Sequence, residues 1–187
     1  HGIGRRQRQM CIRDRPNFYL HLVLLLASNL GFTLSLETIM NNKIPPPLVT
    51  IFFGCCIYFS KDFFLTINTQ ALTLLSYVLF LLGFGILFSA ARSFKEHKTT
   101  INPIKIETAS SLVVSGIFNY SRNPMYLGMA LILLGLSLKF NLIGGLIFTT
   151  LFILFITNFQ IKPEEKAMQK IFGEEFLSYK NRVRRWL

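Results

Sequence analysis

Apolar residues along this chain gather in five long blocks separated by short polar segments. The blocks span residues 18–36, 46–59, 69–91, 125–140 and 142–161. A helix needs about 20 residues to cross the roughly 30 Å hydrocarbon core of a bilayer, within a range of about 17 to 25. The third and fifth blocks reach that length. The pattern predicts an all-α fold, a polytopic transmembrane helix bundle with four core membrane helices and, as an open alternative, a fifth at the N-terminus.

The later part of the chain indicates how these helices are connected. The last two long blocks are separated only by a short polar break at residues 139–141, which is typical of a tight helical hairpin. After residue 161 the chain becomes charged, and Phe172, Phe176, Tyr179 and Val183 recur at helical spacing. We therefore expect a C-terminal cytoplasmic amphipathic helix, which lies on the membrane surface, caps a pocket or simply docks on the bundle.

Charge gives this arrangement an orientation. The net charge is +11, and the basic residues concentrate in the loop at residues 92–122 and in the tail after residue 162. The segments around Lys61 and Lys139 carry little charge. The positive-inside rule places the long loop and the C-terminus in the cytoplasm, and we expect a bacterial inner-membrane protein. A basic chain also suits nucleic acid, but the apolar blocks favour a membrane, so no nucleic-acid partner is expected.

The first 39 residues conflict with this orientation. Alternating crossings place residues 1–17 outside the cell, although they hold five arginines, which disfavour export. One interpretation is that residues 1–39 are a non-native extension and that the native protein begins at Met40. The other is an extra membrane helix preceded by an exported basic tail. In both interpretations residues 40–187 form the membrane domain.

Several kinds of chemistry have no support in the sequence. The cysteines Cys11, Cys55 and Cys56 form no CxxC pair, and the three histidines are scattered, so we expect no metal site. The chain has no P-loop, GxSxG or HExxH motif. A lone GxG at Gly83 and Gly85 lies within an apolar block, where small residues favour helix packing.

Polar residues close to membrane depth are candidates for function because they are costly there. They concentrate at residues 116–128 and 158–165, and the predicted hairpin brings both segments to the same cytoplasmic rim. Arg122 beside a proline-led helix start suits an anionic group, although an arginine that only marks the interface fits equally. Glu164 and Glu165 suit hydroxyl or cationic groups, or they are ordinary first-turn acids. Asn158 and Gln160 either line a pocket or bond between helices.

A set of motifs carries a family resemblance. In order, they are Thr99-Thr-Ile-Asn-Pro103, Leu112-Val-Val-Ser-Gly116, Ser121-Arg-Asn-Pro-Met-Tyr-Leu-Gly128, Pro163-Glu-Glu165, Phe172-Gly173, Tyr179 and Val183-Arg-Arg-Trp-Leu187. Together they resemble the bacterial isoprenylcysteine carboxyl methyltransferase-like family, which is related to the phospholipid methyltransferases. The resemblance covers roughly residues 43–187.

The resemblance implies a membrane methyltransferase domain that uses S-adenosyl-L-methionine, with Arg122 and Glu165 as catalytic residues. The cofactor-binding residues that it implies are Gly116, Tyr120, Arg122, Asn123, Pro124, Tyr126, Leu127, Gly128, Glu164 and Glu165. Eukaryotic members usually have histidine where this chain has Asn123, so a proton relay through that position is not expected. The amide can still donate and accept hydrogen bonds.

The acceptor is expected to be a lipid or a lipophilic small molecule. Arg122 would orient a carboxylate acceptor, and a glutamate such as Glu165 would remove the proton from an amine acceptor. Two other functions stay open at this point. One is a membrane NADPH-dependent reductase of the sterol-reductase type, and the other is a non-catalytic binding or scaffold protein. The sequence does not indicate an oligomeric state.

Overall fold

The computed structural model describes residues 44–64, 67, 69–96 and 111–187. All of them belong to one unit, Met40–Leu187, and they form helices without any strand. The predicted block at residues 18–36, the interpretation of residues 1–39 and the motif at residues 99–103 lie outside the described residues.

The helices of the described residues follow the predicted blocks closely. They are α2 (Pro46–Phe59), the 3₁₀ turn η1 (Ser60–Asp62), α3 (Gln70–Glu96), the 3₁₀ turn η3 (Gly116–Asn119), α4 (Pro124–Phe140), α5 (Leu142–Ile156), the π-helical turn η4 (Thr157–Ile161) and α6 (Lys162–Arg182). Prolines lie in the first turns of α2, α4 and α6. Proline suits this position because the first turn has no hydrogen-bond partner for its N–H groups.

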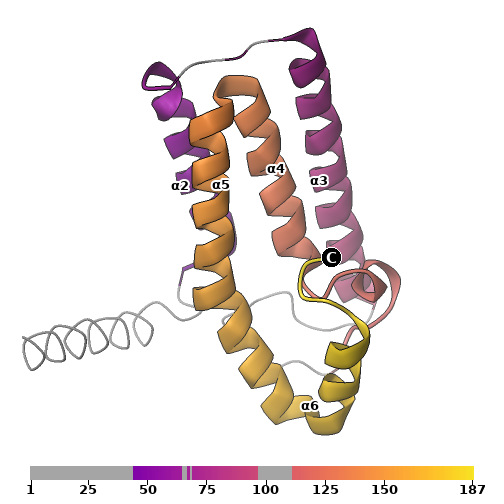
Figure 1. The fold of residues 1–187 in the computed structure, drawn as a ribbon. Coiled ribbons are helices and arrows are strands. Elements are labelled where there is room, and N and C mark those ends of the chain that lie inside the picture. The colour runs from indigo at the N-terminus through magenta and orange to yellow at the C-terminus, as the bar shows by residue number, and fades with distance from the viewer. Residues whose placement is uncertain (1–43, 65–66, 68, 97–110) are drawn as a thin grey trace, which may run out of the picture. The chain divides into compact units, whose positions relative to one another are not determined.

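The α4–α5 hairpin turns at a single buried residue, Asn141. Its side chain accepts a hydrogen bond from the Gly144 amide at 3.1 Å and so caps α5. The same side chain donates to the Ser60 carbonyl at 3.2 Å, which ties the turn to the end of α2. The predicted hairpin is therefore confirmed, and Figure 1 shows it as two adjacent orange helices.

Helix α4 packs against α3, α5 and α2 and so forms the centre of the described bundle. Its contact with α3 is close at Gly83 and Gly128, where a Cβ added to either glycine would come within 2.8 Å of the other's carbonyl oxygen. The expected packing role of Gly83 is thus confirmed, whereas Gly85 has nothing within 4 Å of an added Cβ. This close crossing fixes the first turns of α4 against the middle of α3.

Within the described residues, two helices are long and apolar enough to cross a membrane. They are Gln70–Glu96, with 27 residues, and the continuous helix Leu142–Arg182, whose apolar part is α5. Helix α4 is also apolar, with 17 residues. Large side chains on α3 such as Leu81 (75% exposed) and Phe88 (72% exposed) face outward, as expected for a lipid-facing helix.

The predicted amphipathic helix is α6, and it docks on the loop before η3. Phe176, Tyr179 and Val183 are buried in a cluster with Leu112. The backbone of Gly173 takes a positive φ of 50°, a left-handed conformation that favours glycine, and it bends α6 at that point. Figure 1 shows this bend, after which the chain returns toward the start of α4.

Candidate functional site

The backbone just before α4 is irregular, and this irregularity positions Arg122. Asn123 has φ −129° and ψ 56°, outside the helical region, because the residue before a proline is disfavoured there. The Arg122 amide therefore points away from α4 and donates to the Arg184 carbonyl at 3.0 Å. A segment more than sixty residues away in sequence is in this way held beside the first turn of α4.

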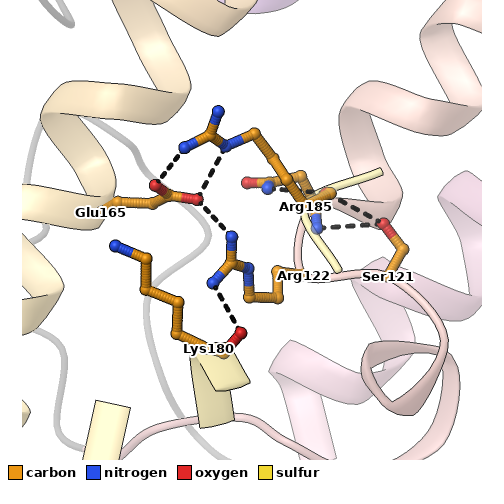
Figure 2. Close-up of polar contacts among 6 residues, drawn as sticks. Ser121, Arg122, Glu165, Lys180 and Arg185 are labelled. Carbon is orange, nitrogen blue, oxygen red and sulfur yellow. Dashed lines mark hydrogen bonds and ion pairs between the residues drawn. The ribbon is translucent and has the colours of Figure 1, made fainter. Parts of the chain in front are cut away.

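A cluster of three charged side chains lies at this point, as Figure 2 shows. Arg122 Nη2 donates to Glu165 Oε1 at 2.9 Å. From the other side, Arg185 donates to both carboxylate oxygens, with Nε to Oε1 at 3.0 Å and Nη2 to Oε2 at 2.7 Å. The side chains of Arg122 and Glu165 are only 8% and 12% exposed, so this pair is largely removed from water. The convergence predicted for Arg122 and Glu165 is present in the structure.

The C-terminal segment also contacts the residues just before α4. The Arg185 carbonyl accepts hydrogen bonds from Asn123 Nδ2 at 3.0 Å and from Ser121 Oγ at 3.4 Å (Figure 2). Trp186 packs against the main apolar core. Asn123 thus serves as a donor to backbone, a role that does not require a titratable group.

A second pair joins Tyr126 in the first turn of α4 to Glu164, the residue before Glu165 in the first turn of α6. Tyr126 donates to Glu164 Oε1 at 2.5 Å, which joins α4 to α6. Burial raises the pKa of Glu164 to about 7, partly offset by the Tyr126 hydrogen bond and reinforced by the charge of Glu165. Burial also acts to raise the pKa of Glu165, but the Arg185 hydrogen bond and the charges of Arg122 and Arg185 outweigh it and lower that pKa. Two adjacent carboxyl groups therefore differ in proton affinity.

The ion cluster carries a net positive charge, because two guanidinium groups share one carboxylate. In addition, Arg122 Nε is buried and has no hydrogen-bond partner among the described residues. A buried donor without a partner costs free energy, which an incoming acceptor atom would recover. The cluster is therefore chemically suited to an anionic group such as a carboxylate.

The other residues implied by the resemblance take different positions. Pro124 is fully buried and Leu127 is 9% exposed, so both belong to the interior of the bundle. Gly128 contacts α3, as described above. Gly116 has a positive φ of 63° at the start of η3 and faces Ser93 on α3, and the Tyr120 side chain is 72% exposed.

Sequence reasoning did not identify Arg185 as a member of this cluster. It lies in a tail with several basic residues, and neither spacing nor hydrophobic pattern distinguishes it from Arg184. The shared motif Val183-Arg-Arg-Trp-Leu187 was the available signal, since a patterned sequence in a charged tail indicates a fixed position.

Comparison with known proteins identifies the family. Residues 71–175 match the phospholipid methyltransferase family. An uncharacterized protein of Haemophilus influenzae is 43% identical over 63 residues, which cover 34% of this chain and all of that protein. The protein-S-isoprenylcysteine O-methyltransferase of Saccharomyces cerevisiae is 30% identical over 124 residues, which cover 66% of this chain and 52% of the yeast enzyme.

The present chain thus spans about half the length of the yeast enzyme. No solved structure matches the chain significantly. The family match covers more than half of the chain. It includes the whole Ser121–Gly128 motif and the whole Pro163–Glu165 motif. This chain is accordingly a member of the phospholipid methyltransferase family, the membrane methyltransferases to which the isoprenylcysteine carboxyl methyltransferase-like proteins are related.

Proposed function

We propose that this protein transfers a methyl group from S-adenosyl-L-methionine to a lipophilic acceptor at the cytoplasmic face of the membrane. The observation that carries the proposal is the ion cluster of Arg122, Glu165 and Arg185 at the rim of the α4–α5 hairpin. A largely buried cluster with excess positive charge costs free energy of desolvation. The family match suggests that this charge binds the methyl donor.

The residues at the rim fit the polar parts of this cofactor. Arg122, with its unpartnered Nε, matches the cofactor's carboxylate. Glu164 and Tyr126 offer oxygen atoms to hydroxyl groups or to a positive charge. When bound, S-adenosyl-L-methionine supplies an electrophilic methyl group on a sulfonium.

The two glutamates are suited to different tasks. Glu165 has a lowered pKa and stays ionised at neutral pH, so its role is to orient Arg122 and hold Arg185 in place. A general base works best when its pKa lies near the operating pH. Glu164, with a pKa of about 7, is better matched than Glu165 to removing a proton from an amine acceptor. We therefore propose Glu164, rather than Glu165, as the base for an amine acceptor.

The proposed topology has four core membrane helices, α2, α3, α4 and α5. Lys95 and Arg92 at the end of α3, together with the charged α6, support a cytoplasmic rim by the positive-inside rule. A lipophilic acceptor would reach the rim from the bilayer, and the polar cofactor would reach it from the cytoplasm. This arrangement separates the two routes and keeps water from the reacting atoms.

Methyl transfer from labelled S-adenosyl-L-methionine into a total lipid and small-molecule extract tests the proposal. The wild-type protein should label an extractable lipophilic product. Arg122→Ala should lower the rate about 100-fold, as loss of a positioned charge typically does. Arg92→Ala is the matched control, because Arg92 forms an exposed ion pair with Glu96 and should leave the rate unchanged. A folded wild-type protein that labels no fraction of the extract would contradict the proposal.

A further inference from the structure

Gln160 is a fully buried amide at the point where the apolar and charged parts of the longest helix meet. Its relative exposure is 0%, and it lies in the π-helical turn Thr157–Ile161. Turns of this kind insert an extra residue into a helix and are frequent at functional sites. The turn rotates Gln160 inward, whereas its neighbour Asn158 faces outward and bonds to Lys162.

The orientation of the Gln160 amide is fixed by one hydrogen bond. Its Nε2 donates to the Ile44 carbonyl at 2.8 Å, just before α2. The carbonyl oxygen, Oε1, must therefore point elsewhere, and it is buried with no hydrogen-bond donor among the described residues. Buried acceptors are normally satisfied, so an unsatisfied one needs an explanation.

The position of Gln160 indicates which ligand would satisfy it. Gln160 precedes Glu164 by four residues, which is about one turn of this helix. Glu164 belongs to the rim, and Gln160 lies one turn closer to the apolar α5. Ile44, whose carbonyl bonds to Gln160, packs against the main apolar core, and the next residue, Ile161, belongs to that core. A ligand group at this depth has apolar surroundings on one side and the polar rim on the other, as the first polar group of an amphiphile would.

We propose that Gln160 Oε1 accepts a hydrogen bond from the head group of the acceptor, which is therefore an amphiphile with an O–H or neutral N–H donor. The identification of the ligand as the methyl acceptor rests on the proposed function. The binding site itself can be tested without methyl transfer. It makes Gln160 a residue that selects the acceptor by its donor group. Ligands that lack the donor would leave Oε1 unsatisfied, and such mismatches discriminate strongly.

Fluorescence quenching measures this selectivity, because Trp186 is the only tryptophan and packs against the same core as Ile44. The probes are 11-bromoundecan-1-ol and its methyl ether, which differ in one O–H group. Each is titrated into the purified full chain in detergent, and the half-quenching concentrations are compared. Wild-type protein should favour the alcohol about tenfold, the effect of one buried hydrogen bond.

Variants assign the preference to the amide. Gln160→Met should abolish it, and Gln160→Asn, which withdraws the oxygen by one methylene, should reduce it even if the first variant folds poorly. Asn158→Leu is the control and should retain it. Equal binding of the two probes to wild-type protein, or a full preference in a folded Gln160→Met protein, would overturn the inference.

Calorimetry with S-adenosyl-L-methionine separates this result from the proposed function. Unchanged cofactor affinity in Gln160→Asn, together with the lost probe preference, supports an acceptor site. A weakened cofactor affinity with the probe preference intact would assign Oε1 to the cofactor and refute the acceptor assignment. A protein that binds no cofactor but shows the probe preference would refute the proposed function and leave the Gln160 site standing.

Discussion

The raised pKa of Glu164 makes a prediction about stability and pH. Its pKa moves from a usual value of 4.5 to about 7, with burial as the main cause. The folded protein then binds the proton more tightly than the unfolded chain does. The stabilisation is therefore fully present below pH 4.5 and is lost as the pH rises through about 7. Glu165 acts in the opposite sense: its lowered pKa stabilises the folded protein above the usual pKa of a glutamate, and this contribution is lost only as the pH falls below that value.

The size of the effect follows from the two pKa values. Each tenfold change in proton affinity corresponds to about 1.4 kcal/mol, so a rise from 4.5 to about 7 is worth roughly 3 kcal/mol. Most of that loss should fall between about pH 5 and pH 8. Glu164→Gln keeps the shape of the side chain and removes its titration, so its free energy of unfolding should lack this component.

Unfolding of the purified protein in mixed detergent micelles at several pH values between 5 and 8 measures the effect. Groups elsewhere that titrate in this range contribute to both proteins, so the difference between wild type and Glu164→Gln isolates Glu164. A difference that stays constant across this range would refute the reasoning. It would show that Glu164 is solvated and ionised throughout.

Two further predictions concern the ion cluster and the helix crossing. Glu165→Ala should destabilise the protein by about 3–5 kcal/mol, because it leaves the buried Arg122 charge without its partner, whereas Arg185→Ala removes a pair that is 33% exposed on the arginine and should cost about 1 kcal/mol. Equal losses in the free energy of unfolding would contradict the assigned burial. Gly128→Ala should cost about 1–3 kcal/mol, because its Cβ would meet α3 backbone at 2.8 Å, while Gly85→Ala meets nothing and should be neutral or slightly stabilising in the same unfolding assay.

Local pattern was sufficient to predict most of the fold. Proline-led starts and the polar break at residues 139–141 gave the bounds of α2 and α4 to within a residue or two. The bend at Gly173 and the π-helical turn before α6 were not predicted. Both depend on how the chain packs against distant segments, and hydrophobic periodicity does not contain that information.

The part of the candidate site that the α4–α5 hairpin brings together could be predicted from the sequence. The topology alone brings Arg122 and Glu165 to the same rim, and the structure shows their contact. The contribution of Arg185 depends on a bend and on backbone hydrogen bonds across more than sixty residues, which no local pattern encodes. The burial of Gln160 likewise follows from the π-helical turn, so the sequence left its role open between a pocket and a helix contact.

The central claim is that Arg122, oriented by Glu165, holds S-adenosyl-L-methionine at the rim. Calorimetric titration of this cofactor into wild-type protein, Arg122→Ala and Glu165→Ala in detergent tests it most directly, with Arg92→Ala as the exposed control. We predict that wild type and the control bind equally and that each of the other two variants binds at least about tenfold more weakly, the loss of one charge-assisted contact. Equal cofactor affinity in all four folded proteins would contradict the account.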